Sequence, residues 1–302
     1  MTVFKKIKRN TVYYFARSLY WLLNVVPRSF ALMLSSFAGL AAWKLVPRER
    51  HRIFRHLTLA FGDKLTVAQK NNIGRCFFVN SGKNLADVVR FKKHYHSQIS
   101  KLVEVEGLEH LDRAYRRGKG IVGITGHIGN FELSAVYLQN IGYELAVIGR
   151  EMYDRRLDRL IVGNREALGL TNIATTDSPK RLLSWLRQGK MVGVLIDTDS
   201  FRIRGMHIPV FGRPSYTPVG QSMLALKTGA AVVPLACLRT PDDRYKLIIR
   251  PEIIIDPNLK GDEAVYDLTF KCTKVLEDII KSEPNQWIWL HNRWRTRIQN
   301  TP

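Results

Sequence analysis

The chain has 302 residues, enough for one large α/β domain or two modest ones. Its content of 45% hydrophobic and 24% charged residues excludes a wholly disordered protein. The charge is less ordinary, because 47 Lys and Arg against 26 Asp and Glu give a formal net charge of +21. Such a field attracts anions, whether nucleic acid, anionic lipid headgroups or an acidic carrier protein. The three cysteines lie far apart without a CxxC pair, which excludes a zinc ribbon and a disulfide framework.

Two apolar stretches, residues 12–26 and 29–43, follow a basic start and are separated by Pro27 and Arg28. Each is shorter than the roughly 20 apolar residues that one membrane span needs. Because basic residues flank both ends, a segment held on one leaflet fits the charges better than an oriented span. A secretory signal peptide is disfavoured by the long, broken apolar region, and a buried helix pair is the remaining alternative. We predict that residues 1–46 form a membrane-associating helical segment, with spanning and surface binding both open.

Residues 47–302 are expected to form one α/β domain. Residues 47–101 have the pattern of polar-faced helices, since apolar residues recur four apart at Ile53, Leu57 and Phe61. From about residue 102, short apolar runs alternate with helical stretches. The runs predict strands at residues 121–125, 143–148, 191–196, 231–238 and 245–255, with helices at 131–140, 154–168, 179–188, 219–228 and 262–281.

Nearly continuous apolar strands with helices between them indicate a sheet that is covered on both faces. We therefore predict a mixed, mainly parallel central sheet flanked by helices. The strand at residues 245–255 follows the preceding one closely, so we expect it to be antiparallel. In the aromatic tail we expect Trp287 and Trp289 to close the core.

The strongest chemical signal is the segment Gly126-His127-Ile128-Gly129-Asn130-Phe131-Glu132, which joins a buried strand to an apolar helix. Ligands of open α/β sheets bind where strands end in such loops. A histidine there has a pKa suited to proton abstraction near neutrality, and Glu132 can fold back onto its ring. Gly129 allows a tight turn, and Asn130 is a plausible helix N-cap that leaves amide groups to face an anion. The other reading, a packing or surface histidine, fits His51, His56, His94, His96 and His110 better.

At these residues the chain resembles the lysophospholipid acyltransferase superfamily, and more narrowly the late acyltransferases of lipid A biosynthesis, the lauroyl and myristoyl transferases. The likeness begins with the His-x4-Glu signature, includes the early basic and apolar segments, and covers nearly the whole chain in order. It continues at residues 196–199, 208–214, 217–218, 228–234 and 284–297. Thr198 stands where the family usually has Gln, which bears on the acceptor more than on the chemistry. The E-G-T-R-type motif of the glycerolipid members is absent from the sequence, and Glu132 replaces their usual Asp.

The resemblance implies a glycerolipid acyltransferase-like fold and direct transfer of a fatty acyl chain from a thioester. His127 would be the general base on an acceptor hydroxyl, Glu132 would orient the imidazole, and backbone N–H groups around Gly129 are the nearest oxyanion donors. The implied donor is acyl carrier protein or acyl-CoA. The implied acceptor is a lipid A precursor, or alternatively another anionic glycolipid or a phospholipid, at the cytoplasmic face of the cell inner membrane.

Further basic and acidic residues are candidates for substrate binding. Arg150 follows a predicted strand and should open onto the edge that holds His127, and Arg213 flanks the loop of Asp197 and Asp199. Guanidinium groups suit phosphate recognition, although each arginine has a solvated surface reading and the aspartates have a loop-capping reading. Neither a metal nor a cofactor is expected, because HExxH and Cys/His clusters are absent from the sequence.

Two other classes of protein remain as alternatives. The charge alone suggests a nucleic-acid-binding protein, but the apolar N-terminus and the lack of a nucleic-acid motif in the sequence argue against one. A non-catalytic membrane scaffold would leave the His127 segment without a role. We therefore expect no nucleic-acid partner.

Overall fold

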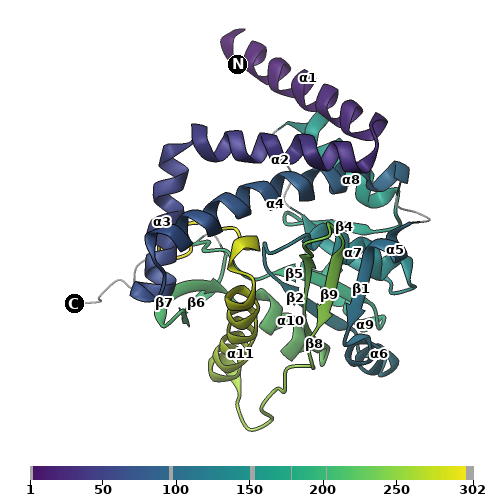
Figure 1. Cartoon of the computed structure of the whole chain (residues 1–302). Coiled ribbons are helices and arrows are strands. Elements are labelled where there is room, and N and C mark those ends of the chain that lie inside the picture. Colours follow the sequence, from purple (N-terminus) through teal and green to yellow (C-terminus); the bar gives the residue numbers. More distant parts are fainter. Residues whose placement is uncertain (1–2, 95–97, 150–153, 178, 202, 297–302) are drawn as a thin grey trace.

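The computed structural model describes residues 3–94, 98–149, 154–177, 179–201 and 203–296. A seven-stranded sheet with the order β1-β9-β8-β2-β5-β3-β4 forms its centre (Figure 1). The neighbours are parallel except for the antiparallel pair β8 and β9. The strands are β1 (Val103–Glu106), β2 (Ile121–Thr125), β3 (Leu145–Gly149), β4 (Thr171–Ala174), β5 (Met191–Leu195), β8 (Ala231–Arg239) and β9 (Tyr245–Ile249). A separate hairpin joins β6 (Gly205–Val210) to β7 (Arg213–Pro218).

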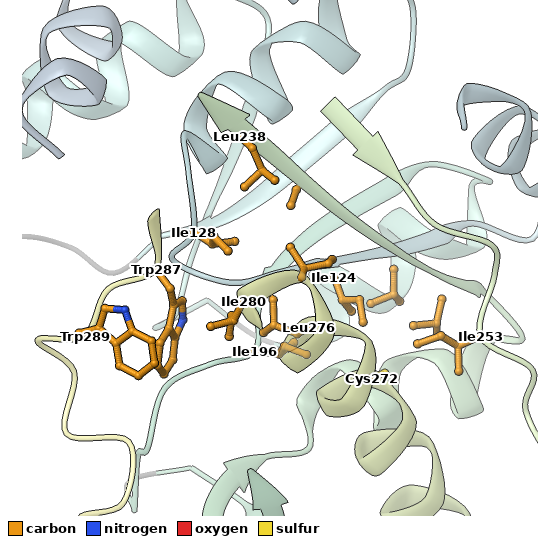
Figure 2. Packing of buried hydrophobic residues seen from close by; sticks show 14 of the residues in the cluster. Ile124, Ile128, Ile196, Leu238, Ile253, Cys272, Leu276, Ile280, Trp287 and Trp289 are labelled. Carbon is orange, nitrogen blue, oxygen red and sulfur yellow. The ribbon is translucent and has the colours of Figure 1, made fainter. Parts of the chain in front are cut away.

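Helices bury both faces of the sheet, as its apolar strands require. One face packs against α5 (Ile99–Leu102), α6 (Leu108–Arg116) and α7 (Phe131–Asn140). The other packs against α9 (Pro179–Arg187), α10 (Gly220–Thr228) and α11 (Gly261–Ser282). Figure 2 shows Trp287 and Trp289, which follow the short 3-10 helix η2 (Pro284–Gln286), closing this second core beside α11. Both indoles are at most 1% exposed, so the prediction that they are core residues is confirmed.

The N-terminal helices form a layer above the sheet: α1 (Val3–Val25), α2 (Arg28–Leu45), α3 (Pro47–Phe61), the turn η1 (Gly62–Lys64) and α4 (Val67–His94) (Figure 1). α2 packs closely along α4. A Cβ atom on Gly39 of α2 would lie only 2.6 Å from the Phe78 carbonyl oxygen of α4, so the glycine permits this approach. The face of α2 that points away from α4 exposes Phe30, Met33 and Phe37. The helix α8 (Arg155–Glu166) touches both α1 and α4.

Among the described residues, no single helix has the length and apolarity of a membrane span. One pair, Arg28–Leu45 with Pro47–Lys64, passes the same test jointly but is bent by 87°. It stays a prediction that residues 1–46 associate with a membrane. The division of the chain into residues 1–46 and a domain of residues 47–302 also stays a prediction.

The predicted fold class, a mixed and mainly parallel sheet flanked by helices, is confirmed, and so is the antiparallel strand after β8. That strand is shorter than predicted and ends at Ile249, two residues before Pro251, which lacks an N–H group for a sheet ladder. The sequence analysis missed β1 and β4 because these four-residue strands form the two edges of the sheet and have no apolar run. It also missed the hairpin β6–β7, whose register pairs Pro209 with Pro214.

Candidate active site

His127 and Asp197 come together because their strands are register partners. β2 and β5 are neighbouring parallel strands in which Thr125 pairs with Leu195. Two residues beyond these positions, His127 Nδ1 lies 2.8 Å from Asp197 Oδ1. The His127 backbone N–H donates to Asp197 Oδ2 at 2.7 Å, so the carboxylate holds both the ring and the main chain. With Nδ1 bound to Asp197, Nε2 is the nitrogen left for a substrate.

The surroundings of this pair keep Asp197 ionised and His127 basic. Asp197 is 3% exposed, and Trp287 Nε1 donates to its Oδ2 at 2.8 Å. Burial alone would raise the Asp197 pKa, but the charge and hydrogen bonds of His127 and the Trp287 bond lower it to about 2. Burial works to lower the His127 pKa, but the charge and hydrogen bond of Asp197, with a smaller contribution from Glu132, raise it above 6.5.

Glu132 has a different partner from the one that the sequence analysis predicted. Its carboxylate forms a two-point ion pair with Arg165 of α8, through Nε at 2.9 Å and through the NH2 nitrogen. Arg165 also donates to Asn172 Oδ1 at 2.9 Å. Among the hydrogen bonds of the described residues, none joins Glu132 to the imidazole. The prediction that Glu132 orients His127 by accepting its N–H is therefore corrected, because Asp197 occupies Nδ1 and Arg165 occupies the Glu132 carboxylate.

Two further rings contact the His127 imidazole. Phe131 meets it edge-on with 5.2 Å between the ring centroids, and His291 lies beside it at 4.9 Å with 36° between the ring planes. The His127 side chain is 22% exposed. The ring is thus held on three sides by Asp197, Phe131 and His291.

The glycine turn after His127 is fixed by hydrogen bonds that use its amide groups. Gly129 has a φ of 57°, and its N–H donates to the Gln286 carbonyl at 3.0 Å. The Asn130 N–H donates to the Cys237 carbonyl at 2.7 Å. The N–H groups of Gly129 and Asn130 are thus used inside the protein and are not free to bind an oxyanion in this structure. The prediction that backbone N–H groups around Gly129 bind the oxyanion stays a prediction for the other amides of the turn. The prediction that Asn130 caps α7 is confirmed, since its Oδ1 accepts from Leu133 N at 3.1 Å.

A cavity of about 310 Å³ opens beside His127, between α4, α7, α8 and the end of α1. Most of its wall surface is apolar, with contributions from Leu85, Val88 and Leu160, and polar side chains share the lining. His127, Gly129, Asn130 and Glu132 also line it, so four of the predicted site residues share one cavity. A narrower cavity of about 50 Å³ lies between α7 and the sheet, and Phe131 and Glu132 line both. Its floor includes Gly123 and Gly193, which are register partners on β2 and β5.

Residues 1–296 match the family model of bacterial lipid A biosynthesis acyltransferases. The chain belongs to this family. The lipid A biosynthesis lauroyltransferase of Escherichia coli (strain K12) is 26% identical over 286 residues, which cover 93% of this chain and 90% of the relative. The lipid A biosynthesis palmitoleoyltransferase of the same organism is 23% identical over 291 residues, 94% and 91% of the two chains. A phosphatidylinositol mannoside acyltransferase of Mycobacterium tuberculosis is 28% identical over 162 residues, about half of each chain (52% and 51%). The resemblance found in the sequence is thereby confirmed, and the protein is an acyltransferase.

The remaining predicted site residues that the structure describes, Asp197, Asp199 and Arg213, are not part of the lining of the larger cavity. Asp199 accepts the backbone N–H groups of Arg295 and Thr296 at 3.0 and 2.8 Å, so it fixes the C-terminal tail. Arg213 is exposed and donates to the Leu59 carbonyl at 2.8 Å. Asp197 acts on His127 and is not among the residues that line the larger cavity. Arg150 lies outside the described residues.

Sequence reasoning missed Arg165, His291 and the role of Trp287. Arg165 could be found only from the three-dimensional structure, because α8 brings it to Glu132 from 33 residues away. Asp197 carried a usable signal, since it follows an apolar strand at the offset at which His127 follows its own. Among the described residues, no group of three or more His, Cys, Asp or Glu is arranged to hold a metal ion.

Proposed function

We propose that this acyltransferase moves a fatty acyl chain from a thioester donor, acyl carrier protein or acyl-CoA, to a hydroxyl of a lipid A precursor. The observation that carries the proposal is the His127–Asp197 pair opening onto an apolar cavity in a chain of this family. A cavity of about 310 Å³ falls within the range of ligand pockets, and most of its wall surface is apolar. It suits a lipid chain better than a nucleotide or a sugar.

In the proposed reaction His127 is the general base. Its Nε2 takes the proton of the acceptor hydroxyl as the oxygen attacks the thioester carbonyl carbon. Asp197 keeps the proton of the imidazole on Nδ1 and stabilises the imidazolium that forms, as the third member of a catalytic triad does. The tetrahedral intermediate collapses with loss of the thiolate, which receives the proton from His127. An oxygen ester and a free thiol are the products.

Glu132 and Arg165 have a supporting role in this proposal. Each side chain of this ion pair is 16% exposed. Glu132 lines both cavities, and Arg165 lines the narrower one. Glu132 balances the charge of this half-buried guanidinium and fixes its position, so the pair supports the wall beside His127. The charge of Glu132 also raises the His127 pKa slightly.

A second acceptor class has a specific observation in its favour. The mycobacterial phosphatidylinositol mannoside acyltransferase matches this chain with a somewhat higher identity than the lauroyltransferase, although over only half of the chain. The alternative is therefore acyl transfer to another anionic glycolipid. The formal net charge of +21 on the chain would attract either anionic acceptor, and an acidic carrier protein as well.

We place the reaction at the cytoplasmic face of the inner membrane. The exposed apolar side chains of α1 and α2 support contact with lipid: Ile7, Val12, Tyr14, Phe15, Trp21, Val25, Phe30, Met33 and Phe37. An exposed apolar group of this size on helices with basic neighbours is typical of interfacial binding.

The test combines mass spectrometry with purified enzyme. Membrane lipids are compared with and without the protein, and the enzyme is then given acyl carrier protein or acyl-CoA thioesters with a lipid A precursor or a phosphatidylinositol mannoside. We expect an added acyl ester on the lipid A precursor, and a loss of transfer of about 10²–10⁴-fold in His127→Ala. Transfer to the mannoside alone would select the second acceptor, and full transfer by His127→Ala would refute the mechanism.

A further inference from the structure

The imidazole of His291 packs beside that of His127. Its ring centroid is 4.9 Å from that of His127, whose Nδ1 is bound to Asp197. A substrate hydroxyl bound at His127 Nε2 would therefore approach a pair of adjacent imidazole rings. Tail residues far along the chain bring a second histidine to the site.

The tail that carries His291 is fixed on both sides of this residue. Before it, the Ile288 N–H donates to the His127 carbonyl at 3.0 Å. After it, Arg293 is 2% exposed and donates to Ser215 Oγ and Thr217 Oγ1, each at 2.7 Å. The backbone thus sets the position of the ring. Within the part of the chain that the structure describes, the His291 imidazole has no hydrogen-bond partner of its own, so its N–H is available to a substrate.

The surroundings of His291 favour the neutral form of the ring. Burial lowers the His291 pKa below 6.5, and the positive charges of His127 and Arg293 lower it further, while Asp197 works in the opposite direction. A neutral imidazole carries one N–H and can donate a hydrogen bond without bringing a second cation next to the His127 imidazolium. Two adjacent imidazolium rings would repel each other and oppose proton uptake by His127.

Acyl transfer needs donors for the negative charge that develops on the thioester oxygen. Two backbone groups close to His127 are already used, because the Gly129 N–H binds Gln286 and the Asn130 N–H binds Cys237. We propose that neutral His291 is a catalytic residue that donates its ring N–H to this oxyanion; the proposal rests on the proposed acyl transfer at His127. The C–O bond forms as His127 takes the hydroxyl proton, His291 stabilises the oxyanion, and the returning electron pair expels the thiolate.

The test compares two substitutions in the full-length enzyme. His291→Phe keeps an aromatic ring beside His127 but removes the N–H, and we expect kcat to fall about 10²–10³-fold with little change in KM. His291→Gln restores a neutral N–H donor and should recover part of the loss. His207→Phe is the matched control, since His207 is also half-buried with its ring against a tyrosine, 5.5 Å from that of Tyr216. It should leave kcat unchanged.

The outcomes separate this proposal from the reaction on which it rests. If His127→Ala abolishes transfer while His291→Phe keeps the wild-type kcat, the role of His291 is refuted and the proposed function stands. If His127→Ala retains full transfer, the proposed mechanism itself is refuted. Equal losses in the Phe and Gln variants, with equal falls in Tm, would mean a packing role and would overturn the proposal. A loss in Thr125→Val, at a buried hydroxyl with no partner among the described residues, without one in His291→Phe would assign the donor to Thr125 instead.

Discussion

His127 and Asp197 occupy equivalent positions on two neighbouring parallel strands, each two residues beyond the paired positions Thr125 and Leu195. The 2.8 Å contact between the ring and the carboxylate follows from this register, and does not depend on a flexible loop finding the right conformation. A site placed at the ends of two central strands is rigid, which favours catalysis that depends on geometry.

The first prediction concerns the base and its carboxylate. Asp197→Asn should lower kcat about 10²–10⁴-fold, because the ring loses its orientation and its preferred tautomer. Asp197 raises the His127 pKa, so its loss should also shift the acid limb of kcat/KM to lower pH. The base must be unprotonated, so in the wild type kcat/KM should fall as pH drops through a pKa above 6.5. The measurement is the pH dependence of kcat/KM for the wild-type enzyme and for Asp197→Asn.

Asp199→Asn is the matched control for this prediction. Asp199 lies two residues further along the same loop and accepts hydrogen bonds from Thr296, not from the imidazole. We expect this variant to be less stable while the acid limb stays in place. An identical shift of the limb in both variants would contradict the assignment of Asp197.

The second prediction concerns Glu132 and Arg165. Each loses its partner when the other is substituted, so Glu132→Gln and Arg165→Gln should both lower the free energy of unfolding. The double variant should lose less than the sum of the two, with a coupling of about 0.5–3 kcal/mol. Denaturant unfolding of the wild type, the two single variants and the double variant measures this coupling.

Because Glu132 contributes less than Asp197 to the His127 pKa, Glu132→Gln should shift the acid limb of kcat/KM less than Asp197→Asn. Additive losses would contradict a stabilising ion pair, and a larger shift for Glu132→Gln would contradict the assignment of Asp197 as the main source of the raised His127 pKa.

The sequence predicted the parts of this molecule that depend on local patterns. The strand at residues 121–125 and the helix at 131–140 have the predicted bounds, because a buried strand and a capped apolar helix are both visible in their residues. Glu132 was assigned to His127 because the two are close in sequence, whereas the actual pairing depends on which strand lies beside β2. That neighbour is β5, and strand order cannot be obtained from periodicity. The same limit applies to His291, which reaches the site only because the tail pairs with residues 127–129.

The third prediction concerns membrane binding. Phe15 and Phe37 are 70% and 63% exposed on α1 and α2. Replacing both by Asp removes two large apolar groups from the proposed lipid-facing surface, and should weaken binding to anionic lipid vesicles by roughly 2–4 kcal/mol, about 30-fold to several hundredfold. Ile254→Asp is the control, because Ile254 is 74% exposed on a loop away from these helices. Cosedimentation with vesicles in high salt isolates the apolar contribution to binding. Equal binding by the wild type, the double variant and Ile254→Asp would place the lipid contact elsewhere.

The last prediction asks which cavity receives the acyl chain. Leu85 lines the larger cavity and is 54% exposed, so Leu85→Trp can narrow the cavity without disturbing the core. If the chain lies there, KM for long-chain thioesters should rise while short-chain thioesters are used as before, because only the long chain reaches the obstruction. Gly193→Val fills the narrower cavity, where a Cβ on Gly193 meets nothing closer than 3.8 Å.

Both variants are assayed with a series of thioesters of increasing chain length, and Tm is measured for each. We expect Leu85→Trp to shorten the preferred chain and Gly193→Val to leave the preference unchanged. The reverse result would place the chain between α7 and the sheet, and would leave the larger cavity to the acceptor lipid. In either case His127 stays at the junction, because Phe131 and Glu132, which follow it at the start of α7, line both cavities.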